Sequence, residues 1–254
     1  MRVLLLLFFF VVPGLFANPI GDSKQIVVSL SPSWSSPDAE VYVFEKVKHT
    51  WQPQWHFPST IGKKGLGWGQ GLHSSYLQPK KGEPIKHEGD KKAPAGVFRL
   101  VETFGYATRE DLPPVHERLP AYHQVNEESR CVDDFKSRYY NNQVYDQRLV
   151  KKDWDSHEEL LRKDELYKLA IVVDHNQVNV PDLNRSKKFG SCIFLHLWRG
   201  PSTGTAGCTA FSEENMLKLL SLLDASKNPV LVQFPKEVYQ RIYKSWELPE
   251  LGVP

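Results

Sequence analysis

The chain of 254 residues has little cysteine and methionine, with three and two residues respectively. It also has no internal repeat, no low-complexity tract and no long block of like charge. Without such a block, the sequence does not show the electrostatic signature of a protein that binds nucleic acid or a membrane surface. Three cysteines are too few for a disulfide scaffold, and a chain of this length can bury a sizeable core without one. We therefore expect a monomeric globular protein that binds neither nucleic acid nor a membrane.

Long apolar runs are missing after the first residues. Arg2 precedes a leucine- and phenylalanine-rich core that ends at Ala17, and this run is short for a membrane span. We interpret residues 1–17 as a secretory signal peptide, with an uncleaved anchor as the alternative. Its removal leaves 31 basic and 30 acidic residues. Residues 18–254 are then expected to form one exported domain that is not bound to the membrane.

The periodicity of the mature chain predicts strands more often than helices. Apolar or alternating segments predict strands at residues 25–30, 40–47, 97–101, 169–173, 193–195 and 230–234. Helical spacing is found at residues 156–167, from the N-cap Ser212 to residue 223, and at residues 236–246. We predict a mainly β fold with peripheral helices.

Two regions lack a clear period. Residues 102–152 are polar and spotted with proline, which predicts a long insertion lying over the sheet. Residues 51–71 are rich in turn formers, and their tryptophans are assigned to packing, with stacking on glycan rings as the alternative. The glycine-rich run at 65–71 is interpreted as a flexible surface connection, with a substrate-facing loop as the alternative. A dinucleotide loop is excluded because the run has no buried strand before it and no helix after it.

A histidine and a cysteine carry the strongest chemical signal. His196 ends an apolar strand, a turn-rich loop follows, and Cys208 comes next among small residues. Only a thiolate attacks, and a free cysteine is about 3% thiolate at neutral pH. An imidazolium that lowered the pKa to about 6.5 would raise that fraction to roughly three quarters. We therefore expect a cysteine nucleophile with a histidine partner, and oxyanion donors in the backbone N–H groups of Gly207 and Cys208.

These residues resemble a known family. His196 followed by Thr205-Ala206-Gly207-Cys208 is similar to the active-site signature of the L,D-transpeptidase (YkuD-type) family, a histidine and then Ser/Thr-x-Gly-Cys. Residues 89–98, GDKKAPAGVF, are similar to the family's G-D-x-x-T-P-x-G-x-F block. Residues 131–140 and 173–176 also resemble a subgroup, so that the resemblance spans about residues 40–234.

The resemblance implies a β-sandwich-like catalytic fold with the cysteine loop at its edge. It also implies that the backbone carbonyl of Leu197 orients the imidazole of His196. The sequence departs from the family at Ala206, where a histidine is usual, and at Ala210, where arginine or asparagine is usual. Arg199 is the candidate to bind a substrate carboxylate in place of the missing side chain.

Other polar residues have weaker assignments. If Cys208 is the nucleophile, Cys131 and Cys192 are left to form a disulfide, with two buried thiols as the alternative. His175 ends a strand and is a candidate to line the same cleft as His196, with a purely structural hydrogen-bonded role as the alternative. The adjacent Asp133 and Asp134 are assigned to capping a turn, with metal binding or acid–base chemistry as the alternative.

The expected function is therefore an exported cysteine acyltransferase of the periplasm or cell wall, acting on peptidoglycan stem peptides without cofactor or metal. A carboxypeptidase that hydrolyses the same bond is one alternative, and an inactive cell-wall-binding protein is another. A zinc hydrolase that uses His175, His196 and Cys208 ranks lowest, because no close spacing of ligands supports a metal site.

Overall fold

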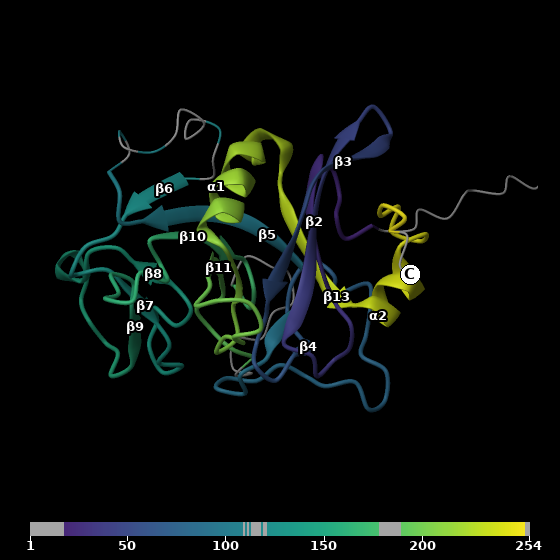
Figure 1. Cartoon of the computed structure of the whole chain (residues 1–254). Helices are drawn as coiled ribbons and strands as arrows, with labels where there is room; N and C mark the ends of the chain where they lie inside the picture. Colours follow the sequence, from purple (N-terminus) through teal and green to yellow (C-terminus); the bar gives the residue numbers. More distant parts are fainter. Residues whose placement is uncertain are drawn as a thin grey trace, which may run out of the picture.

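The computed structural model describes residues 18–108, 110, 112, 118, 121–177 and 189–251, so the predicted signal peptide lies outside the described residues. Strands outnumber helices in the described part of the chain, which confirms the prediction of a mainly β fold (Figure 1). None of the helices found there has the length and apolar character needed to cross a membrane.

Ten strands form the main sheet. They are β1 (Gln25–Ser31), β2 (Asp38–Val47), β3 (Thr50–Thr60), β4 (Leu66–Trp68), β5 (Ala93–Gly105), β6 (Ala121–Gln124), β10 (Leu169–Val173), β11 (Phe194–Leu197), β12 (Thr209–Phe211) and β13 (Val230–Pro235). Their order is β10-β11-β12-β3-β2-β1-β13-β5-β4, with β6 beside β5. Because β5 also pairs with β10, the path of strands closes on itself.

Strand β1 separates two hydrophobic cores. Ile26 and Val28 face a core that includes Val238 of the C-terminal helix, whereas Val27 faces a core that includes Leu219 of the other helix. Every residue of β1 is buried. A strand covered on both faces carries apolar residues at successive positions, as Ile26, Val27 and Val28 do here.

Two α-helices lie at the periphery of the sheet (Figure 1). Helix α1 (Glu213–Leu222) begins after Ser212, whose hydroxyl accepts the Asn215 N–H at 3.2 Å, and this confirms the predicted cap. Helix α2 (Lys236–Ile242) follows β13 directly and is shorter than predicted. Short 3-10 turns occupy Gln147–Leu149 and Ala225–Lys227.

A second, three-stranded sheet replaces the helix predicted at residues 156–167. Its strands are β7 (Arg130–Val132), β8 (Gln143–Val144) and β9 (His157–Glu159), in the order β8-β7-β9. The helix prediction is wrong because β9 pairs with β7, with Glu158 opposite Cys131, and a long-range pairing of this kind overrides a weak helical pattern.

The predictions for residues 51–71 and for the end of β5 also need correction. Residues 50–60 form β3. One edge of this strand pairs with β2 along its whole length, whereas the other edge pairs with β12 at Thr60. A strand with a largely free edge tolerates its two prolines, which had suggested turns. Strand β5 continues to Gly105, past the predicted end at Val101, because β10 and β6 pair with its extension.

The glycine-rich run is buried rather than a surface connection. It contains strand β4, which pairs in parallel with β5. A Cβ atom on Gly69 would lie 2.7 Å from the Cβ of Pro94 and 2.9 Å from Nδ1 of His175. The glycine is therefore needed for close packing of this run against β5 and His175.

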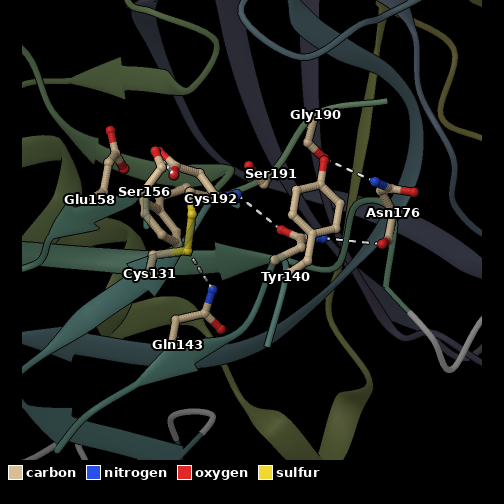
Figure 2. The surroundings of a disulfide bond; sticks show 12 residues. Cys131, Tyr140, Gln143, Ser156, Glu158, Asn176, Gly190, Ser191 and Cys192 are labelled. Atoms are coloured by element: carbon tan, nitrogen blue, oxygen red, sulfur yellow. Dashed lines mark hydrogen bonds between the residues drawn. A yellow bond between two sulfur atoms is a disulfide. The ribbon is translucent and has the colours of Figure 1, made fainter. Parts of the chain in front are cut away.

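A disulfide connects the two sheets. Cys131 of β7 is bonded to Cys192, which lies two residues before β11 and 61 positions further along the sequence. The amide of Gln143 lies beside the sulfur of Cys131 (Figure 2). The Cys192 N–H donates to the side chain of Asn141 at 2.9 Å. The small sheet is thereby fixed against the start of β11.

The double substitution Cys131→Ser/Cys192→Ser should lower the free energy of unfolding by about 4 kcal/mol, because a loop of this length loses much entropy when the unfolded chain is cross-linked. Denaturant unfolding of the oxidised protein measures this difference. The matched control is Cys208→Ser, which leaves the disulfide intact. Equal unfolding midpoints for wild type and double variant would contradict the prediction.

Candidate active site

A cavity of about 230 Å³ lies where the end of β11, the loop after it and the small sheet meet. Seven of the eight residues that the sequence predicts for the site line this cavity: His196, Leu197, Arg199, Thr205, Ala206, Gly207 and Cys208. The remaining predicted residue, His175, is not among the lining residues.

The pairing of β11 with β12 brings His196 and Cys208 to the same cavity. The two strands are parallel, and His196 lies opposite Ala210. Alternate residues of an extended chain share one face, so Cys208, two positions before Ala210, is directed to the face that carries His196. The connecting loop is held by the bond from Thr205 N–H to the Ile61 carbonyl, at 2.9 Å.

The imidazole of His196 is fixed in one tautomer. Its Nδ1 lies 2.7 Å from the Leu197 carbonyl, which can only accept, so Nδ1 carries the proton. Nε2 is then the unprotonated nitrogen that can act as a base. The Tyr167 ring packs against the imidazole with 5.2 Å between ring centroids. Burial lowers the pKa of His196 to about 4, so the ring is neutral at physiological pH.

The thiol of Cys208 is neutral as well. Only 7% of the residue is exposed. Burial raises the pKa of Cys208 to about 12, and the nearby Glu158 carboxyl adds to the rise. The sulfur accepts the Phe194 N–H at 3.4 Å, and its proton is directed to the Cys192 carbonyl at 3.5 Å. The expected resting thiolate–imidazolium pair is therefore wrong, because the cavity wall removes both groups from water.

The predicted oxyanion donors also change. The Gly207 N–H donates to the Thr205 hydroxyl at 3.1 Å, and that hydroxyl donates to the Cys208 carbonyl at 2.6 Å. Thr205 thus closes a tight turn before Cys208 and occupies the Gly207 N–H. The N–H of Cys208 remains as the backbone group that could donate a hydrogen bond to an oxyanion.

His175 has a structural role outside the cavity. Its Nδ1 accepts the Gln70 N–H at 3.2 Å, and its Nε2 donates to the Phe189 carbonyl at 3.1 Å. Burial lowers the pKa of His175 to about 3, with the charge of Lys86 acting in the same direction. A neutral ring with both nitrogens bonded positions the backbone around the site and takes no proton from a substrate.

Arg199 lies at the cavity but already has an anionic partner. Its Nη2 is 2.7 Å from Asp164, and Arg162 makes two further bonds to the same carboxylate at 2.7 and 2.8 Å. The two guanidinium groups hold the pKa of Asp164 well below its usual range, with Arg162 the larger contributor. Two arginines sharing one carboxylate leave a net positive charge at this side of the cavity.

Several lining residues were not predicted from the sequence, among them Lys86, Glu158, Arg162 and Tyr167. The Tyr167 hydroxyl donates to Glu158 at 3.0 Å, and burial raises the pKa of that carboxyl. Glu158, Arg162 and Tyr167 come from the segment that had been predicted as a helix. Lys86 lies three residues before the GDKKAPAGVF block, and its closeness to this family-like block is the sequence signal that could have identified it.

The adjacent aspartates accept hydrogen bonds within turns. Asp134 accepts the N–H groups of Lys136 and Asp155, as expected for a residue that caps turns, and Asp133 accepts the Ser156 hydroxyl. Within the described ranges, no group of three or more histidine, cysteine, aspartate or glutamate side chains is arranged to hold a metal ion.

Alkylation of Cys208 by iodoacetamide should accelerate about tenfold per pH unit between pH 7 and pH 10, because the thiolate fraction grows in this way below a pKa of about 12. The rate is measured by mass spectrometry on the non-reduced protein, in which Cys131 and Cys192 are protected by their bond. Cys208→Ser is the control for labelling elsewhere. A rate that levels off near neutral pH would contradict the neutral thiol.

Comparison with known proteins places the fold in a family. A model of the YkuD L,D-transpeptidase catalytic domain matches residues 25–232. The comparison with curated proteins finds no match. Among solved structures, the chain is similar to Bdellovibrio bacteriovorus Bd1075, with 17% sequence identity and a TM-score of 0.39 over 84% of this chain and 48% of that one. It thus spans about half the length of that structure. Because the family model covers most of the chain, this protein belongs to the YkuD L,D-transpeptidase catalytic domain family.

Proposed function

We propose that this protein is an exported cysteine acyltransferase that acts on peptidoglycan stem peptides. The observation that carries the proposal is the shared cavity, in which the Cys208 thiol and a histidine with an unprotonated Nε2 are presented together by the β11–β12 pairing. Family membership supports the reaction type. The small residues Ala206 and Gly207 beside the thiol leave room for a peptide backbone to approach.

The reaction would proceed through an acyl-enzyme. The sulfur of Cys208 attacks the carbonyl carbon of the bond before the terminal D-amino acid, while Nε2 of His196 takes the thiol proton. The tetrahedral intermediate collapses, the carbon–nitrogen bond breaks, and the imidazolium returns the proton to the leaving amine. The thioester then reacts with an amine, which gives transpeptidation, or with water, which gives carboxypeptidation.

The neutral resting pair determines when the proton moves. A thiol with a pKa near 12 and an imidazole with a pKa near 4 do not exchange a proton before substrate arrives. Transfer therefore has to be coupled to the attack, when the thiol turns from the Cys192 carbonyl toward Nε2. Substrate binding excludes the remaining water and aligns the thiol, the imidazole and the substrate carbonyl.

Export is part of the proposal. The apolar N-terminal run supports a secretory leader, and the Cys131–Cys192 disulfide suits an oxidising compartment. We therefore place the mature protein in the periplasm or at the cell wall.

The test is turnover of purified muropeptides, followed by chromatography and mass spectrometry. Cys208→Ala should reduce turnover by at least about a thousandfold because the nucleophile is lost. His196→Ala should reduce it by about a hundredfold or more because the general base is lost. The matched control is His49→Ala, which removes an exposed histidine from the β2–β3 turn.

Three outcomes decide between the candidate functions. A new amide product with an added D-amino acid as acceptor indicates transfer, whereas the shortened peptide alone indicates hydrolysis. Full activity in the folded Cys208→Ala variant would eliminate the mechanism. Inertness of the wild type toward every muropeptide would favour an inactive wall-binding protein.

A further inference from the structure

Lys86 is a buried cation in the wall of the cavity that holds Cys208. It is 2% exposed, and it lies in the segment between β4 and β5. Burying an ammonium group is costly unless hydrogen bonds and an opposite charge compensate it. A lysine in such a position therefore needs an explanation in terms of what its charge does.

The position of the ammonium group is fixed by one turn. Its Nζ donates to the His87 carbonyl and to Asp90, each at 2.9 Å. The Asp90 carboxylate in turn accepts the N–H groups of Lys92 at 2.9 Å and His87 at 2.7 Å. The negative charge of Asp90 is thus shared among three donors, and the turn holds Lys86 rigidly. An ammonium group has three donors, so one N–H of Lys86 is left over.

Two glycines let this ammonium group approach the nucleophile's loop. A Cβ atom on Gly190 would lie 2.9 Å from Nζ, so this position accommodates the lysine because it has no side chain. A Cβ atom on Gly207 would lie 3.8 Å from the same nitrogen. The charge of Lys86 is therefore next to the residue that precedes Cys208.

The site has few free donors for an oxyanion beside the N–H of Cys208. Thr205 occupies the Gly207 N–H, Ala206 has no polar side chain, and Arg162 and Arg199 are both bonded to Asp164. Attack by Cys208 nevertheless turns a neutral carbonyl oxygen into an anion, and a site that lowers this barrier needs donors arranged beforehand. The ammonium group of Lys86 lies beside Gly207, whereas that of Lys92, whose carbonyl also approaches Gly207, donates to the Lys64 carbonyl.

We propose that Lys86 is a further catalytic residue, which donates its remaining N–H to the oxyanion of the tetrahedral intermediate formed at Cys208. This inference rests on the proposed function. The interaction is weak with the neutral carbonyl of the bound substrate and strong with the anion, so it stabilises the transition state more than the ground state. In a cavity that excludes water, such an interaction is stronger than it would be in solution.

The effect of the Lys86 charge on the Cys208 thiol supports the same proposal. Burial dominates the pKa of Cys208 and raises it, whereas the charge of Lys86 opposes that rise. An ammonium group that stabilises negative charge on the sulfur is placed to stabilise it on an oxygen bound next to that sulfur.

The experiment compares wild type with Lys86→Met and Lys86→Gln in steady-state turnover of muropeptides with tetrapeptide stems. Methionine keeps the length of the side chain without charge or donors, and glutamine keeps donors without charge. Both should lower kcat by about a hundredfold or more, as the loss of one oxyanion donor does, with KM changed by less than about threefold. Lys91→Met, at an exposed position in the same segment, is the matched control and should retain full activity.

A second readout needs no substrate. The pH profile of Cys208 alkylation by iodoacetamide should shift to higher pH in both Lys86 variants and stay unchanged in Lys91→Met. Circular dichroism and thermal unfolding show which variants are folded. If one of the two Lys86 substitutions prevents folding, the other still tests the proposal.

The outcomes separate the alternatives. A folded Lys86 variant that keeps kcat within twofold overturns the proposal, and a raised KM with unchanged kcat overturns it in favour of a lysine that binds a substrate carboxylate. If wild type turns over no muropeptide, the proposed function fails. The alkylation profile then decides on Lys86 alone, and an unshifted profile overturns its electrostatic role.

Discussion

The parallel pairing of β11 with β12 is the constraint on which the site depends. It sets His196 opposite Ala210, and Cys208 enters the same face two residues earlier. The loop between the two strands is held to the Ile61 carbonyl through Thr205, and the disulfide fixes the segment that leads into β11. His196 and Cys208 are thus positioned by backbone hydrogen bonds of the main sheet. Rigid elements of this kind hold catalytic groups more accurately than a free loop does.

Burial excludes water from the site and also keeps its two candidate catalytic groups uncharged. The same wall that excludes water keeps both thiol and imidazole neutral. Such a site gains reactivity only when charge develops during attack, so its fixed dipoles and cations matter more than the ionisation of the free enzyme. Lys86 and the arginine pair at Asp164 supply positive charge around the cavity, and Glu158 with Tyr167 lies beside His196. This surplus of positive charge suits the anionic intermediate of the proposed reaction.

The sequence predicted what depends on local patterns. The apolar runs of β1, β10 and β13, the Ser212 cap, and the strand-borne His196 followed by Cys208 are all local signals. It failed where long-range pairing decides: β9 forms because β7 lies beside it, and β3 because β2 does. The protonation states were missed because burial is a property of the fold. Lys86 was missed because its proximity to Gly207 depends on a turn and on two glycines far apart in the sequence.

The central claim is that Cys208 forms a covalent bond with the acyl group of a peptide. Intact-protein mass spectrometry, on wild type quenched in acid during turnover of muropeptides, tests it most directly. The account predicts an adduct equal in mass to the muropeptide less its terminal D-amino acid, located on Cys208 by peptide mapping. Turnover without any adduct at this cysteine, or with the adduct on another residue, would contradict it.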